Sequence, residues 1–307
     1  MISNLDSEST LFLANVDCIQ QRIADANTQM SSGKKINVAS DAPDQIGALL
    51  QLRADRQRNS QIQSNLALAK TDASSADDAL SAAIQVMDRA VTLAAQGATY
   101  TTDSAGRQSI AQEIEGLQAQ MVSYSQTQVQ GRYIFSGDQS DSPAYQLDLD
   151  GVNLTLNPAN GVDRLSTAAS TRRVEDPAGG SFAVAKTAQE IFDGSGGDNV
   201  FAALNSLRLA LVNNDAAGIA GTTAALHQAS DHLNAMQAFY GTVENRIDDA
   251  TTFAGNYDIQ LQTEISQKED ADATAAALEM AQANTQLQAA FQMRAQVPRK
   301  SLFDYLG

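Results

Sequence analysis

The side chains that could do chemistry are few and poorly spaced in this chain of 307 residues. The two histidines, His227 and His232, are five residues apart, so on a helix they face different directions and do not share a metal ion. Asp138 and Asp141 begin like a calcium loop, but the further carboxylates and the glycine of such a loop do not follow. These residues predict structural or solvated roles, with no metal and no cofactor.

The remaining polar groups favour the same conclusion. Glu113 and Glu115 have the spacing of residues on the solvent-exposed surface of a helix, and not that of an acid/base pair. The same holds for the neighbouring carboxylates at 248–249. The glycine-rich stretch at 194–198 lacks the lysine and the glycine spacing of a phosphate-binding loop, so we expect a joint there. No nucleophile has a matching base, and the sequence predicts a protein that is not an enzyme.

Composition excludes further classes of function. Hydrophobic residues make up 43% of the chain, but aromatics only 5%, which favours alanine-rich helical seams over one large core. With 20 basic and 36 acidic residues the net charge is -16, so nucleic acid and anionic membranes are poor partners. Near the start, no apolar run is long enough for a signal-peptide core or a membrane span. We expect a cytosolic protein, or one that leaves the cell without a cleaved signal. The single cysteine, Cys18, predicts a small packed side chain.

Both ends of the chain carry one apolar stripe with alternating steps of three and four residues, which is typical of a coiled coil. A lone amphipathic helix of this length is marginal in water, so each stripe needs a partner. The simplest partners are the other stripe and further copies of the chain. We therefore expect 1–40 and 270–307 to be disordered in the isolated monomer. The predicted packing residues are Phe12, Val16, Ile19, Ile23, Met30, Met280, Leu287, Phe291 and Val297.

Long helices are predicted inside these ends. Asp41 is a plausible N-cap, with Pro43 in the first turn, for a helix over about 44–96 that would be on the order of 80 Å long. A third helix is expected from about Ile110 to near Gly131, and the period changes from Tyr133.

The pattern in the middle of the chain predicts β-strands. Asp150-Gly151 is a strong signal for a two-residue hairpin turn, which would pair Tyr145 with Leu156 and Leu147 with Leu154. Such a hairpin needs further strands or a helix to cover it, and strands are expected near 172–174 and 182–184.

Helical patterns return after this insertion, first in a helix that Asp198 would cap. A longer one follows over about 216–265, where two glycines weaken the case for strict continuity. An acidic break precedes the last helix, Pro298 ends it, and a short apolar tail follows that includes Leu302, Phe303 and Leu306.

The predicted fold is mainly α with a β-rich insertion. Both chain ends form a long antiparallel helical bundle or coiled coil, and a small β domain lies in the middle. The expected organisation is a terminal coiled-coil polymerisation region at 1–40 and 268–307, a helical rod at 41–130 and 191–267, and an outer β-rich domain at 131–190.

Three segments resemble the bacterial flagellin superfamily. The stretch "SSGKKINVASDAPD" with the long helix after it is similar to the N-terminal part of that superfamily, and "ANTQLQAAFQMRAQVPRKSLFDYLG" is similar to the C-terminal part. Between them, "GRYIFSGDQSDSPAY" resembles the hook-associated protein 3 group, the hook–filament junction proteins, more than filament flagellin.

The resemblance implies a structural subunit of the flagellum that joins hook to filament. Its terminal helices would form the inner layer of a tube, with the rod helices outside them and the insertion facing outward. Its partners would be copies of itself, the neighbouring hook-associated protein and flagellin subunits, and a cytosolic export chaperone. The chain would leave the cell unfolded by the flagellar type III route, without a cleaved signal peptide and without membrane insertion.

Two alternatives remain open. A short filament flagellin has a similar helical frame. A cytosolic signalling or adaptor protein of the helical-rod class is also rich in alanine and glutamine, but such rods turn at a short helical tip and not at an insertion with strand patterning.

Overall fold

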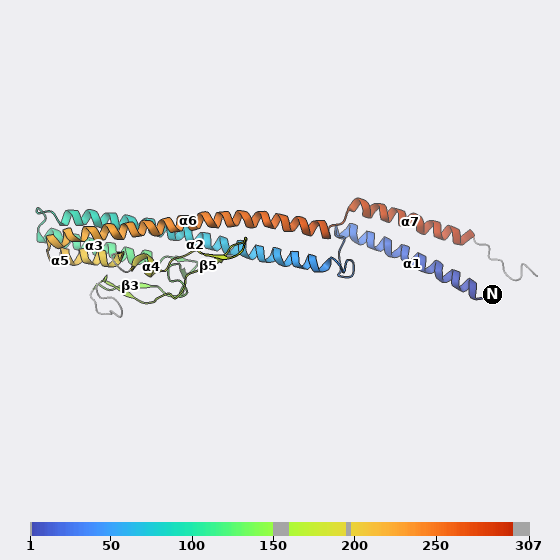
Figure 1. Cartoon of the computed structure of the whole chain (residues 1–307), viewed down its shortest axis with the longest axis horizontal. Helices are drawn as coiled ribbons and strands as arrows, with labels where there is room; N and C mark the ends of the chain where they lie inside the picture. Colours follow the sequence, from blue (N-terminus) through green and yellow to red (C-terminus); the bar gives the residue numbers. More distant parts are fainter. Residues whose placement is uncertain (1, 150–159, 195–197, 297–307) are drawn as a thin grey trace, which may run out of the picture. The chain divides into compact units, whose positions relative to one another are not determined.

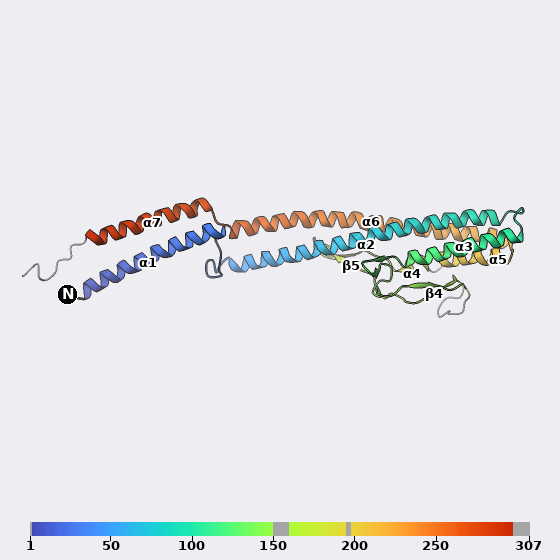
Figure 2. The same ribbon diagram turned by 180° about the vertical axis from the view of Figure 1, so that it is seen from behind.

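The structure is a computed structural model that describes residues 2–149, 160–194 and 198–296. Contacts within the chain divide it into two units, one made of Met1–Arg58 with Tyr257–Gly307, the other of Asn59–Asn256. Both are mainly helical, and small antiparallel strand pairs lie in the second unit (Figures 1 and 2). The predicted fold class, a helical bundle with a small β insertion, is confirmed.

In the first unit the two chain ends pair as helices. Helix α1 (Ile2–Ser32) packs against α7 (Ala273–Gln296) in antiparallel fashion. The structure thus has helices where disorder was expected for the monomer, although few of their side chains are buried. The buried side chains on these two helices, among those the structure describes, are small or medium in size: Val16, Ala26, Ala276 and Ala283.

The same unit contains the start of α2 (Ile46–Gly97) and the end of α6 (Ala216–Glu269). The predicted N-cap at Asp41 is wrong. Its carboxylate instead accepts hydrogen bonds from the backbone N–H groups of Asn37 and Val38, at 2.8 and 2.9 Å, so it stabilises the turn before the helix. A separate turn over 42–45 then leads into α2.

In the second unit α2 and α6 lie side by side (Figures 1 and 2). The Asn59 side chain donates to the carbonyl of Ala254 at 2.8 Å, and Lys70 pairs with Asp248 at 2.5 Å. Helix α6 is continuous through its glycines. Along α2 the sequence has an apolar stripe with alternating steps of three and four residues, and this stripe lies in the core. Its members are at most 1% exposed: Leu66, Ala69, Ala73, Ala76, Leu80, Ala83, Met87, Ala90 and Ala94.

Two shorter helices complete this bundle. Helix α3 (Ser104–Ser125) begins at Asp103, whose side chain accepts from the N–H of Gly106, and it packs on α5 (Val200–Val212). Helix α5 is capped by Asn199 and not by the predicted Asp198. The one-residue shift follows from geometry, because the Asn199 side chain reaches the N–H of Ala202 at 2.8 Å.

In the part that the structure describes, the insertion has a short helix and three two-stranded antiparallel sheets. Helix α4 (Ala188–Phe192) has a capping box between Thr187 and Glu190. The strands predicted near 172–174 and 182–184 are confirmed as β5 and β6. The strand pairs are β1 (Gln128–Val129) with β2 (Arg132–Tyr133), β3 (Tyr145–Leu147) with β4 (Val162–Arg164), and β5 (Arg173–Glu175) with β6 (Ser181–Ala183).

In the described residues β3 pairs with a strand that the sequence analysis did not predict: Tyr145 pairs with Arg164 and Leu147 with Val162. The partners in the predicted hairpin, Leu154 and Leu156, lie outside the described residues. Residues 150–159, with the Asp150-Gly151 pair, lie outside the described residues.

Tertiary contacts hold β4 in the position where it pairs with β3. Gly161 has φ +67° and lies so close to Gln118 and Asn205 that a Cβ would be 2.5 Å from the Gln118 amide nitrogen. That amide donates to the carbonyl of Asn160 at 2.8 Å. These contacts hold the returning strand on α3 and α5, which a local turn signal cannot reveal.

Candidate assembly surface

The α1/α7 pair carries most of the residues that the sequence analysis singled out. Phe12 and Phe291 pack edge to face, with ring centroids 6.2 Å apart. The Arg294 guanidinium lies 5.5 Å from the centre of the Phe12 ring and donates to the Ser9 hydroxyl at 2.8 Å. A second polar contact lies further along, where Arg22 pairs with Glu279 at 2.5 Å.

The structure places the predicted packing residues unevenly. Val16 is buried, whereas five others are half-buried: Phe12, Ile19, Ile23, Met280 and Leu287. Met30 is 43% exposed and Phe291 is 51% exposed. Val297 and the tail residues Leu302, Phe303 and Leu306 lie outside the described residues. The α1/α7 contact therefore covers only part of the apolar stripe.

Further apolar side chains, which the sequence analysis did not select, are exposed on the first unit. Of the fifteen large hydrophobic residues that are exposed in the described part of the chain, nine belong to this smaller unit. Exposed apolar surface concentrated in one region is typical of a surface that binds another protein. The additional residues are Leu11, Leu13, Val38, Leu50, Ile259, Leu278 and Met293. A search for exposed leucines on a helical wheel would have found Leu11 and Leu13.

Cys18 lies on the same helix and is exposed, so its predicted packed role is wrong in this structure. Its neighbours on the stripe, Val16 and Ile19, take the positions that face α7. With 3.6 residues per turn, Cys18 falls outside the stripe that these two residues share, which agrees with its exposure.

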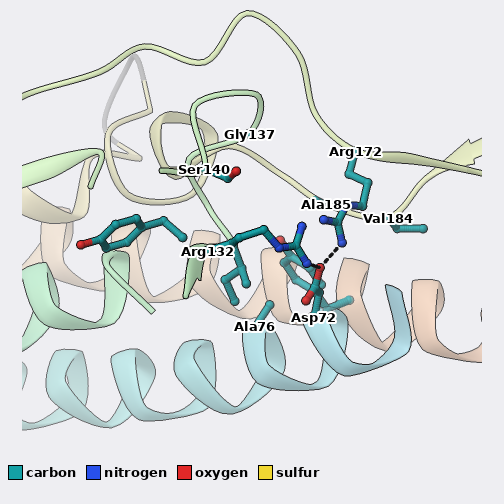
Figure 3. A pocket seen from close by; sticks show the side chains of 11 residues that line it. Asp72, Ala76, Arg132, Gly137, Ser140, Arg172, Val184 and Ala185 are labelled. Carbon is teal, nitrogen blue, oxygen red and sulfur yellow. Dashed lines mark hydrogen bonds and ion pairs between the residues drawn. The ribbon is translucent and has the colours of Figure 1, made fainter. Parts of the chain in front are cut away.

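The second unit has a polar anchor where the insertion meets α2 (Figure 3). The Asp72 carboxylate of α2 forms an ion pair with Arg172, which precedes β5, and lies 3.6 Å from the guanidinium of Arg132 in β2. A small cavity of about 50 Å³ opens beside these side chains, with Tyr240 among its walls. Burial raises the pKa of Asp72, although the charge of Arg132 lowers it.

The "GRYIFSGD" segment at 131–138 forms the apolar half of this anchor. Phe135 is fully buried and packs edge to face on Phe192 and Tyr240, with centroids 5.8 and 6.4 Å away. Gly137 has φ +59°, and a Cβ there would be 2.5 Å from the Ser170 carbonyl oxygen. The motif therefore attaches the insertion to the rod helices.

A buried carboxylate, Asp193, organises the rest of the insertion. It accepts hydrogen bonds from Tyr145 at 3.2 Å, Asn160 at 3.0 Å and Asn199 at 2.5 Å, and pairs with Arg164. Burial, with the nearby charge of Asp193, raises the pKa of the Tyr145 hydroxyl well above its ordinary value. The cluster joins β3, β4 and the start of α5 in a structural role, because each donor is already committed to the same carboxylate.

The residues considered for chemistry have ordinary contacts. A ring nitrogen of His232 lies 2.8 Å from the carbonyl of Glu190, and Asp138 accepts from the N–H of Ala169 at 3.0 Å. Glu113 pairs with Arg89 at 2.6 Å. Within the described ranges, no three His, Cys, Asp or Glu side chains are grouped as a metal site would require. Nor does any helix described by the structure have the length and apolar character to cross a bilayer.

Comparison with known families gives two matches at the two ends of the chain. The bacterial flagellin N-terminal helical region matches residues 4–140, and the bacterial flagellin C-terminal helical region matches residues 223–306. A comparison with curated proteins finds no match.

Solved structures share the fold at low sequence identity. A protein described as flagellar hook-associated from Vibrio parahaemolyticus is 20% identical, with a TM-score of 0.63, and the match covers 75% of this chain and 100% of that one. Flagellar hook-associated protein 3 from Legionella pneumophila is 12% identical, with a TM-score of 0.61 over 71% of this chain and 98% of that one. FlgL from Bacillus cereus is 19% identical, with a TM-score of 0.55 over 72% and 100%.

The paired terminal helices, the long α2 and α6 and the insertion anchored by 131–138 thus occur in a chain whose two ends match the two conserved regions of flagellins. Since those two matches span most of the chain, this protein belongs to the bacterial flagellin family.

Proposed function

We propose that this chain is a hook-associated junction subunit of the bacterial flagellum, joining hook to filament. The observation that carries the proposal is the way the insertion is attached. The segment at 131–138 anchors a small domain on the rod through Phe135 and the Arg132–Asp72 contact. Solved proteins named as hook-associated share this fold over 98–100% of their own length.

The regions of the chain receive separate roles in this proposal. The terminal helices, 1–40 and 268–307, form the polymerisation region and pack against neighbouring copies. The rod, 41–130 and 191–267, forms the layer outside them, and 131–190 faces outward. The six exposed large apolar residues on α1 and α7 support the polymerisation role, since this helix pair alone leaves them in water.

The partners follow from the same proposal. The chain contacts copies of itself, the adjacent hook-associated protein and flagellin subunits, and before secretion a cytosolic chaperone. It reaches the outside of the cell unfolded through the flagellar type III route, with no cleaved signal. No catalytic role is proposed.

A deletion strain tests the junction role. Cells without this protein should still make hooks but release flagellin into the medium, because filaments have no base on which to be retained. A plasmid copy should restore filaments. Retained, full-length filaments in the deletion strain would contradict the proposal.

A second experiment separates the junction role from a filament role. Purified protein at high concentration should remain monomeric or form short oligomers, because a junction subunit meets different partners on its two sides. Long filaments made from this chain alone would favour the flagellin alternative.

A further inference from the structure

The small cavity beside the anchor is bordered by four separate parts of the second unit (Figure 3). Helix α2 supplies Asp72 and Ala76, and α6 supplies Tyr240. Strand β2 supplies Arg132, and the segment before β5 supplies Arg172. A ligand in this cavity would therefore contact both rod helices and the insertion.

One oxygen of Asp72 has no donor in the part of the chain that the structure describes. Figure 3 shows the side chains of Arg132 and Arg172 extending toward this carboxylate. Both pair with its Oδ2 atom, Arg172 directly and Arg132 at 3.6 Å. The Oδ1 atom is buried, and no described residue donates a hydrogen bond to it. A buried acceptor without a donor loses its hydration and gains nothing in return, so we expect a donor from outside the chain.

The hydroxyl of Tyr240 belongs to the wall of the same cavity. The residue is only 2% exposed, and its oxygen accepts from the N–H of Lys186 at 3.1 Å. Burial raises the pKa of this hydroxyl, although the hydrogen bond from Lys186 lowers it, and the charge of Asp72 adds to the rise. The hydroxyl therefore keeps its proton and can donate it in a further hydrogen bond.

The size and the charges of the cavity determine which ligand fits. Its volume is about 50 Å³, and about 10–15 Å³ is enough for one water molecule. An anion would be attracted by the two guanidinium groups, but it would lie against the carboxylate and leave Oδ1 of Asp72 without a donor. A metal cation would face Arg132 and Arg172. Water both donates and accepts, so it suits the carboxylate and the hydroxyl at the same time.

We propose that this cavity is a water-binding site, in which an ordered water donates to Oδ1 of Asp72 and accepts from the hydroxyl of Tyr240. The water links α2 to α6 at the place where the insertion is attached, so it is a structural part of the anchor. Displacing it leaves a buried carboxylate oxygen unpaired and weakens the second unit. This inference concerns the folded second unit and holds or fails independently of the junction role.

A crystal structure of the full-length chain, at a resolution that shows ordered waters, tests the site directly. It should contain a density peak within about 3.2 Å of both Oδ1 of Asp72 and the hydroxyl oxygen of Tyr240. A cavity without such a peak overturns the proposal. A larger ion held by Arg132 and Arg172 overturns it as well, because the ligand would then be an anion.

Filling the cavity tests whether the water contributes to stability. Ala76 lies four residues after Asp72 on α2, so the two side chains are neighbours. Ala76→Val adds apolar volume that displaces the water and offers no donor to the carboxylate. The melting temperature of the full-length chain, followed by circular dichroism, should fall by about 3–6 °C. If the cavity were only a void, the added methyl groups would gain contacts and the melting temperature would rise.

A matched control measures the cost of valine in this helix. Ala67 is exposed on α2 in the same unit. Ala67→Val introduces the same β-branched side chain without reaching the cavity, and it should lower the melting temperature by less than about 2 °C. A loss at Ala76 no larger than the loss at Ala67 would count against the water.

The Asp72→Ala background separates loss of the water from steric strain. Without the carboxylate no acceptor needs the water, so adding Ala76→Val to Asp72→Ala should leave the melting temperature unchanged or raise it. Equal losses in both backgrounds would mean that valine overpacks the site, and they would overturn the proposal. The crystal structure of the parent chain decides the case if a variant does not fold.

Discussion

Phe12 and Phe291, from the two ends of the chain, pack edge to face with their ring planes at 70° and their centroids 6.2 Å apart. This pair shows that the terminal stripes do contact each other, as their spacing predicts. Yet Phe291 remains 51% exposed, and Leu278 and Met293 on the same helix are more exposed still. The contact between α1 and α7 therefore leaves apolar surface for neighbouring subunits.

Leu287→Asp and Phe291→Asp should abolish incorporation into the flagellum without preventing export. Each change would place a carboxylate in a desolvated seam of the assembly, at a cost of several kcal/mol if it stayed ionised, whereas an unfolded chain in transit buries neither residue. Swarming on soft agar and the protein content of sheared flagella and of the medium measure the two effects.

Gln288→Asp is the matched control, because Gln288 is next to Leu287 in the sequence but is exposed in this structure. It adds the same charge and should keep motility. Normal motility and filament retention in both seam variants would contradict the proposed packing.

Backbone amides of α1 and α7 should exchange with solvent far faster than those of α2 between Leu80 and Ala94 in the isolated monomer. The α2 segment contributes seven buried residues to the main core, but the terminal pair buries mainly alanines, so local opening of the terminal pair needs less free energy. Hydrogen exchange with mass spectrometry measures this. Equal protection of both regions would rule out the expected disorder of the free ends.

Gly161→Ala should destabilise the second unit by about 2–5 kcal/mol. A left-handed backbone costs alanine about 1–2 kcal/mol, and displacing Gln118 breaks its bond to Asn160, which adds about 1–3 kcal/mol. Urea denaturation followed by circular dichroism gives the change in unfolding free energy. Gly131→Ala is the control, since Gly131 has a similar φ of +76° but no atom within 4 Å of the added Cβ. Equal losses would mean that backbone strain alone acts at Gly161.

Phe135→Ala should cost about 3–5 kcal/mol of stability, because it empties a site in the core of the anchor between Phe192 and Tyr240. Limited proteolysis should then cut the insertion earlier than the rod helices. Leu165→Ala, at a side chain 47% exposed in the same insertion, should change stability by less than about 1 kcal/mol. A small loss for Phe135→Ala would show that the insertion is held chiefly by the ion pairs at Asp72.

The contact between the two connections, residues 33–45 and residues 269–272, should become less stable in acid. The folded-state pKa of Glu269 lies below the ordinary value of 4.5, so its contribution to stability is present above that pH and is lost as the pH falls through the folded pKa. Lys34 and Arg53 face this carboxylate, while the neighbouring Asp270 is bonded to Ser266 and is unchanged in the Glu269→Gln variant. The difference in exchange protection at Lys35 and Ala271 between the parent and E269Q should therefore be large at pH 7 and vanish in acid.

The sequence by itself determined the helical frame. The stripe from Leu66 to Ala94 and the strands near 174 and 182 could be predicted because each depends on the spacing of apolar residues within one short segment. The three segments similar to flagellins were also visible in the sequence.

Only the tertiary structure decided which segments meet. Tyr145 pairs with Arg164, which no local pattern predicted, and Gln118 and Asn205 from distant helices pack closely on Gly161 at the start of that strand. Glu269 looked like one acid in an acidic break until folding brought Lys34 and Arg53 to it. Periodicity records the burial of one element, whereas the partner of a strand or a charge depends on long-range contacts that no window of sequence contains.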